Sequence, residues 1–117
     1  MRSADVHSGL TAPRLSVLSV LTFGGDRTIT QLADAEQVRA PTMTRLIDGL
    51  QRDGFVRRTS DPHDARIARV TATEKGRSTL EAARERRVGA IEKLLRRLSP
   101  SQLRTLAQAA TIIEQLT

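Results

Sequence analysis

The sequence predicts a mainly α-helical fold with one small β-hairpin, arranged as a winged helix-turn-helix followed by two C-terminal helices. In the middle of the chain, Met43, Leu46, Ile47 and Leu50 recur at the spacing that gives a helix one apolar face. Two short β-prone runs follow, separated by the turn-forming cluster 60–64. A short helix with a polar outer face and a basic hairpin beyond it suit a DNA groove and its flank.

Composition narrows the class of protein. The 117 residues suit one domain with a net charge of +6, and residues 39–69 carry seven basic and four acidic side chains. A polyanionic partner is therefore plausible, although many soluble domains are also basic. Aromatic residues make up 2% of the chain, too few for the base-stacking surfaces that bind single strands. The sequence has no cysteine, which excludes disulfides and thiol-based sensing, and no apolar run of membrane-spanning length, so we expect a cytoplasmic protein.

The first part of the chain is predicted to hold a tail and two helices. Residues 1–10 show no clear pattern and are read as the tail. Thr11 can cap a helix that runs to Phe23, with Pro13 in its first turn, where a missing N–H does no harm. The remaining expected elements are a short strand at Thr28–Ile29, a helix Gln31–Glu36 capped by Thr30, and a turn at 36–38.

Residues 39–73 complete the predicted DNA-binding region, which spans 11–73. The recognition helix is expected at Pro41–Asp53, and Gly54 should end it because glycine adopts a positive φ without strain. The strands of the wing are expected at Phe55–Thr59 and Ile67–Thr71.

Residues 74–117 are predicted to form two helices, Glu74 to about Leu98 and Ser101–Leu116, with Thr73 capping the first. Their wide apolar face is more than one small domain can cover, so we expect a homodimer. The alternative is that the helix pair folds back onto its own core. The residues expected at the dimer interface are Leu80, Val88, Ile91, Leu95, Leu98, Leu103, Leu106, Ala110 and Ile113.

Four stretches together resemble the MarR family of bacterial winged helix-turn-helix repressors. They are LTAPRLSVL at 10–18, ITQLAD at 29–34, PTMTRLIDGLQRDGFVRR at 41–58 and DPHDARIARVTATEKGR at 61–77. The resemblance implies a dimeric regulator of transcription, a repressor rather than an activator, that binds double-stranded DNA. It also implies control by a small effector, often a phenolic or lipophilic anion, and no cofactor.

The chain departs from the family pattern at three points. Only nine residues precede Leu10, where the family usually has another dimerisation helix, so either the chain is short here or its dimer uses mainly the C-terminal helices. Arg39 stands where a small polar cap is usual, and Gln37 stands at a position that is commonly glycine.

The DNA-binding residues can then be assigned by role. Thr42, Thr44 and Arg45 are expected to face the major groove, where arginine can read guanine. Arg66 is expected to enter the minor groove from the tip of the wing, held in shape by Asp64. Contacts with the DNA backbone are expected from Thr30, Gln31, Arg39, Arg57, Arg58 and Arg69. Ala40 and Pro41 are counted with the DNA-binding residues at the start of the recognition helix, where Pro41 is a helix starter and not a base reader.

Other readings of these residues predict different behaviour. The polar helix face could be an ordinary solvated surface, and Asp64–Arg66 a simple exposed ion pair. A winged-helix interaction module that does not bind DNA would tolerate loss of Arg45 and Arg66. We see no constellation of catalytic residues, and two histidines, His7 and His63, without a nearby cluster of acidic residues do not make a metal site, so we expect neither an enzyme nor a metal centre.

Overall fold

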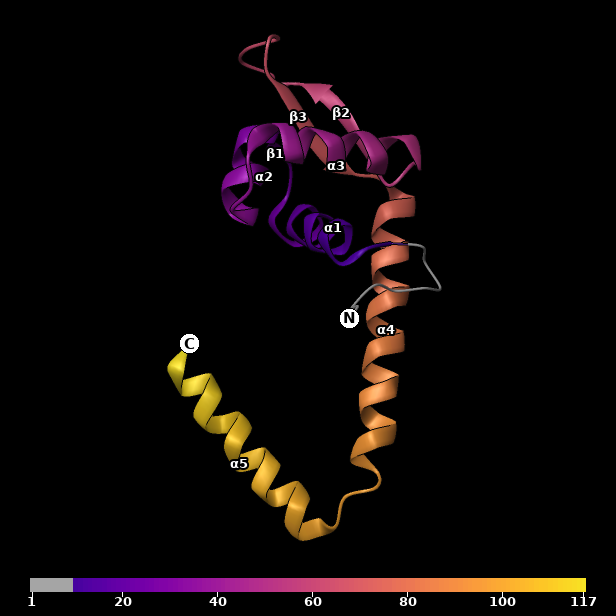
Figure 1. The fold of residues 1–117 in the computed structure, drawn as a ribbon, viewed down its shortest axis with the longest axis vertical. Coiled ribbons are helices and arrows are strands. Elements are labelled where there is room, and N and C mark those ends of the chain that lie inside the picture. The colour runs from indigo at the N-terminus through magenta and orange to yellow at the C-terminus, as the bar shows by residue number, and fades with distance from the viewer. Residues whose placement is uncertain (1–9) are drawn as a thin grey trace. The chain divides into compact units, whose positions relative to one another are not determined.

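The computed structural model describes residues 10–117, which form two compact units, one ending at Ala83 and the other beginning at Arg84. The mainly helical class with a small sheet is confirmed (Figure 1). The elements are α1 (Ala12–Gly24), β1 (Arg27–Thr28), α2 (Ile29–Glu36), α3 (Ala40–Arg52), β2 (Val56–Ser60), β3 (Ala68–Ala72), α4 (Glu74–Leu95) and α5 (Pro100–Leu116).

The first unit has one aliphatic core to which α1, α2, α3, the sheet and the start of α4 all contribute. Leu10 is part of this core at 1% exposure, so its assignment to a tail was wrong; the rest of that predicted tail, with His7, lies outside the described residues. Leu80 is also buried here, at 2% exposure, together with Ala83. The first turns of α4 therefore belong to this unit, and the expected dimer contact by Leu80 is wrong.

The predicted N-cap is correct for α1 and wrong for α2. Thr11 caps α1 and Pro13 lies in its first turn, as predicted. The cap of α2 is Thr28 and not Thr30: the Gln31 amide donates to the Thr28 hydroxyl at 3.1 Å, and the Thr28 amide donates to the Gln31 side chain at 2.9 Å. This reciprocal pair satisfies two donors at once, which a cap at Thr30 could not do.

The sheet has the strand order β1-β3-β2, and both pairings are antiparallel. The wing strands start and end one residue later than predicted. Ile67 remains in the turn because its amide donates to the Asp64 carbonyl at 3.0 Å and its own carbonyl accepts from the Asp61 amide at 2.9 Å. Phe55 precedes β2 because its amide donates to the Leu50 carbonyl of α3 at 2.8 Å, so only its carbonyl bonds to Thr73 opposite, at 3.0 Å.

The junction between α3, the wing and α4 depends on two glycines. Gly54 has φ +83° and ends the recognition helix, as predicted. Thr73 caps α4 by accepting from the Gly76 amide at 3.0 Å, also as predicted. A Cβ on Gly76 would overlap the carbonyl oxygen of Phe55, so only glycine lets the first turn of α4 approach the sheet this closely.

The second unit consists of the rest of α4 and all of α5. α4 ends at Leu95 instead of Leu98, because the Arg97 and Leu98 amides turn back to carbonyls three residues earlier. Ser99 then caps α5, which begins at Pro100. Among the described residues, no helix is both long and apolar enough to span a membrane.

Candidate nucleic-acid interface

Helix α3 separates buried from exposed side chains sharply. Met43 and Ile47 are fully buried, whereas Thr42 and Arg45 are exposed and Thr44 is half-buried. At its N-terminus, Arg39 makes no side-chain capping bond, as expected for an arginine in the place of a small polar residue. The first-turn amides of the helix are therefore not capped by a side chain, and such amides can bind an anion. Arg39, Ala40 and Pro41 are all exposed around this end.

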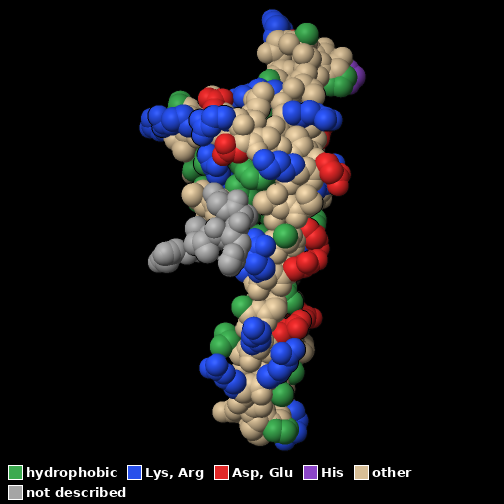
Figure 2. All heavy atoms as spheres, turned by 90° about the vertical axis from the view of Figure 1, so that its right-hand side faces the viewer, with side chains coloured by type: hydrophobic (Ala, Val, Ile, Leu, Met, Phe, Trp, Pro, Cys, Tyr) green, Lys and Arg blue, Asp and Glu red, His purple; other side chains and the backbone are tan. Residues whose placement is uncertain are grey.

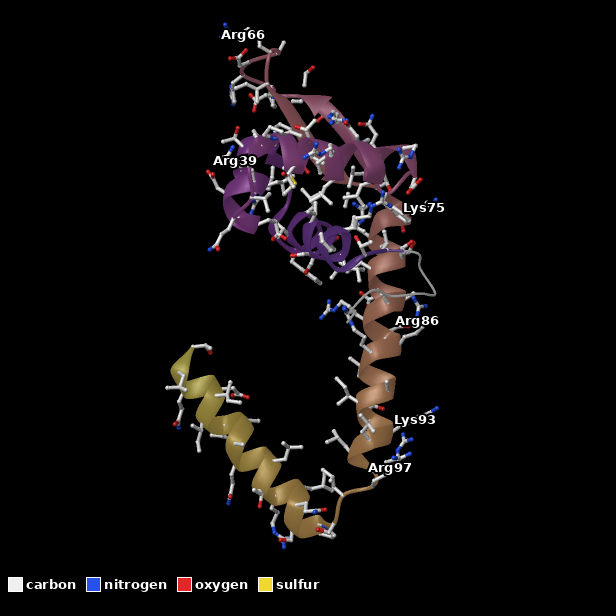
Figure 3. The ribbon with its side chains drawn as sticks, in the orientation of Figure 1. Arg39, Arg66, Lys75, Arg86, Lys93 and Arg97 are labelled. Carbon is white, nitrogen blue, oxygen red and sulfur yellow. The ribbon has the colours of Figure 1, made fainter. Side chains whose placement is uncertain are left out.

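The wing presents Arg66 to solvent. Its side chain is 90% exposed and lies in the loop between β2 and β3, at the far end of the hairpin (Figure 3). The Asp64 carboxylate accepts three hydrogen bonds from Arg66, from the backbone amide, Nε and Nη2, each at 3.0 Å. The Arg66 guanidinium holds the pKa of Asp64 below its usual value, and Asp64 raises the pKa of Arg66. The Arg66 side chain is therefore already oriented in the protein without a binding partner.

Asp61 organises the loop of the wing, directly after the end of β2. Its carboxylate accepts from the amides of His63 and Asp64 at 2.8 and 3.1 Å and from Nη1 of Arg69 at 3.1 Å. The His63 amide, helped by Arg69 and the Asp64 amide, lowers the pKa of Asp61, although partial burial opposes this. Arg69 also donates to the Asp26 carbonyl at 3.2 Å, so its guanidinium ties the wing to the turn before β1. Sequence reasoning missed Asp61 and expected Arg69 on phosphate instead.

The neighbouring arginines of β2 differ in their surroundings. Arg57 is exposed. Arg58 reaches α3, where Nη2 donates to Asp48 at 2.7 Å and Nη1 donates to the side chain of Gln51. The expectation that Arg58 faces the DNA backbone is therefore not supported by its contacts. On α2, Thr30 is exposed, whereas the Gln31 side chain is engaged by the cap.

Other basic side chains lie outside this region. Figure 2 shows Lys and Arg both on the first unit and along α4. In Figure 3, Arg86, Lys93 and Arg97 follow one side of the chain through the end of α4. Within residues 10–117, no group of three acidic, histidine or cysteine side chains is placed to hold a metal ion.

Replacing Asp61 by alanine should loosen the wing, because three donors lose a shared acceptor. We expect the amides of His63 and Asp64 to exchange with solvent about an order of magnitude faster, measured by hydrogen exchange with NMR. Asp34→Ala, which removes an exposed carboxylate on α2, serves as the control and should leave these amides unchanged. Equal exchange in the two variants would show that Asp61 does not hold the wing.

Lowering the pH should loosen the wing of the unsubstituted protein, with the same increase in exchange of the His63 and Asp64 amides. The pKa values of Asp61 and Asp64 are lowered in the folded protein. Their contribution to wing order is therefore complete above the ordinary carboxyl pKa of about 3.9 and is lost as the pH falls through the lowered values.

Comparison with known sequences matches residues 8–67 to the MarR family. A relative from Mycobacterium tuberculosis, described as an HTH-type transcriptional regulator, is 34% identical over 113 residues, which is 97% of this chain and 79% of the relative. The HTH-type transcriptional repressor IacR of Pseudomonas putida is 24% identical over 104 residues, 89% of this chain and 62% of the relative.

Solved structures share the fold. The YusO protein of Bacillus subtilis superposes with a TM-score of 0.86 at 22% identity, over 95% of this chain and 79% of that one. A mutant of S. aureus MepR bound to an oligodeoxyribonucleotide superposes with a TM-score of 0.74 at 22% identity, over 92% and 80% of the two chains.

Proposed function

Because this chain belongs to the MarR family of winged helix-turn-helix transcriptional regulators, we propose that it acts as a homodimeric, ligand-responsive repressor at an inverted repeat in DNA. Membership makes it a DNA-binding regulator of transcription and not an enzyme. Repression is favoured by the relative from P. putida, which is named a repressor. We also propose a cytoplasmic location, since duplex DNA is the proposed partner.

The observation that carries the DNA-binding part is the pre-oriented guanidinium of Arg66, 90% exposed and held by Asp64. We propose that it enters a minor groove while α3 lies in the adjacent major groove. Arg45, with Thr42 and Thr44, would read base edges there. Phosphate contacts fall to exposed groups around these elements, namely Thr30, Arg39, the Ala40 amide and Arg57, whereas Pro41 has no N–H to donate and starts the helix.

The dimer is proposed from the second unit, where apolar side chains are exposed in a way that a single copy does not explain. No residue of α5 is buried. A second copy would cover these side chains and give two recognition helices related by symmetry, as an inverted repeat requires. The exposed large apolar residues here are Val88, Ile91, Leu94, Leu103, Leu106, Ile112, Ile113 and Leu116.

The effector is proposed from the family alone. We take it to be a phenolic or lipophilic anion, and thermal-shift screening of such compounds against the purified protein would identify it. A bound compound should raise the melting temperature and lower the affinity for DNA, since a repressor is released by its effector.

Selection of duplexes from a random pool, followed by footprinting, tests the proposed function directly. We expect an enriched inverted repeat. Arg66→Ala should weaken binding to every duplex about tenfold and reduce the salt slope by about 1, because a sequence-blind contact is lost. Arg45→Ala should also cost about tenfold on the selected duplex but relax preference at particular base pairs. If both variants bind as the parent does, or the parent enriches nothing, the alternative of a winged-helix interaction module is favoured.

A further inference from the structure

The guanidinium of Arg58 joins the two elements that we propose read DNA. Its strand, β2, forms one side of the wing, and its partners Asp48 and Gln51 both lie on α3. The Nη2–Oδ1 distance to Asp48 is 2.7 Å, and the Arg58 side chain is only 28% exposed. Two donors of one rigid planar group are thus shared between two side chains of the recognition helix.

These contacts leave Arg58 poorly suited to bind phosphate. Like Arg66, it is paired with a carboxylate and has two of its donors in use, but its side chain is 28% exposed whereas that of Arg66 is 90% exposed, so its remaining donors are much less accessible. Residues 57 and 58 point to opposite faces of the strand, so exposed Arg57 is the better candidate for a backbone contact.

The other long-range ion pairs of the first unit act elsewhere. Arg14 of α1 binds Asp53 beyond the end of α3 at 2.9 Å, and Arg69 binds Asp61 within the wing. Neither pair connects β2 to the body of α3. The hydrogen bonds from Arg58 to α3 add to the covalent link through residues 53–55. They resist rotation of the hairpin relative to the helix.

We propose that Arg58 is a positioning residue that sets operator preference by fixing the offset between the wing and the recognition helix. The inference rests on the proposed function. Specific binding requires base contacts by α3 and a groove contact by Arg66 at the same time, so it depends on their relative placement. Non-specific binding uses phosphate contacts that either element can make alone, so it depends on the offset much less.

The first test exchanges Arg58 for lysine, which keeps the charge but loses the fork that reaches two partners. Affinities are measured by fluorescence anisotropy for the duplex selected by the parent and for a scrambled duplex of the same composition, at several salt concentrations. We expect the ratio of the two affinities to fall about tenfold with the salt slope unchanged. Arg52→Lys is the matched control, at an arginine of α3 that is 72% exposed and has no proposed contact with DNA, and it should keep the parent ratio.

The second test is Asp48→Asn, at an exposed position where asparagine should be tolerated. A positioning role predicts a similar fall in the ratio. If Arg58 were a phosphate ligand, removing a negative charge from α3 would strengthen binding to both duplexes and leave the ratio intact. Urea unfolding of each variant shows that any loss occurs in a folded protein.

The outcomes separate the two proposals. A parent-like ratio in Arg58→Lys or in Asp48→Asn would overturn the positioning role while the proposed function stands. A parent that prefers no duplex would overturn the proposed function, and the positioning role with it.

Discussion

Replacing both Leu106 and Ile113 by glutamate is expected to turn the proposed dimer into a monomer and to weaken operator binding by about two orders of magnitude. The two side chains lie seven residues apart on α5, one above the other, and are 46% and 61% exposed. Two carboxylates from each copy, buried at the interface without partners, would cost more than the apolar contact contributes. A monomer would then bind one half-site and lose the advantage of simultaneous contact with two.

Light scattering with size-exclusion chromatography measures the mass, and anisotropy measures affinity for the selected duplex. Gln108→Glu is the control, because Gln108 lies on the opposite side of α5 from Leu106. It should leave both the mass and the affinity unchanged. A dimer that survives the double substitution would mean that α5 does not form the interface.

Replacing Gly76 by alanine is expected to destabilise the protein by about 3 kcal/mol. The added Cβ would overlap the Phe55 carbonyl oxygen, a backbone atom that cannot rotate away, and would also press on Leu18 in the core. Relief would require α4 to withdraw from the sheet. That movement would disturb the bonds from Thr73 to the Phe55 and Gly54 carbonyls, at 3.0 and 2.6 Å.

Gly89 provides the matched control in the same helix. A Cβ there meets nothing within 4 Å. Gly89→Ala should therefore stabilise the protein by about 0.5–1 kcal/mol, because alanine loses less backbone freedom in a helix. Urea unfolding followed by circular dichroism measures both changes. Equal effects at the two positions would show that close approach to Phe55 is not what requires Gly76.

Local sequence signals were sufficient for the order of elements and for most of their ends. Thr11, Gly54 and Thr73 act where predicted because a cap or a positive φ depends on a few neighbouring residues. The same reasoning placed the cap of α2 at Thr30, two residues too late. Both Thr28 and Thr30 could cap this helix, and Thr28 does so because the Gln31 side chain accepts a hydrogen bond from its amide. The strand shifts at the wing are of similar size and also reflect individual hydrogen bonds.

The candidate site was only partly predictable. Exposure of Arg45 and Arg66, and the hold of Asp64 on Arg66, follow from helix periodicity and from a two-residue spacing. The carboxylates that bind Arg58 and Arg69 are those of Asp48 and Asp61, ten and eight residues away and outside their strands. No local pattern indicates these pairs. In a chain rich in arginine, sequence shows where positive charge lies but not which charges are already neutralised.

The sequence by itself determined the helices, the hairpin, the apolar positions and the family, because these depend on side-chain period, turn chemistry and motif. Only the tertiary structure decided that Arg58 and Arg69 pair with distant carboxylates and hold the wing, and it moved Leu80 from the expected interface into the core. The physical reason is distance: an ion pair or a buried contact forms between groups that folding brings together, and their separation along the chain does not reveal it.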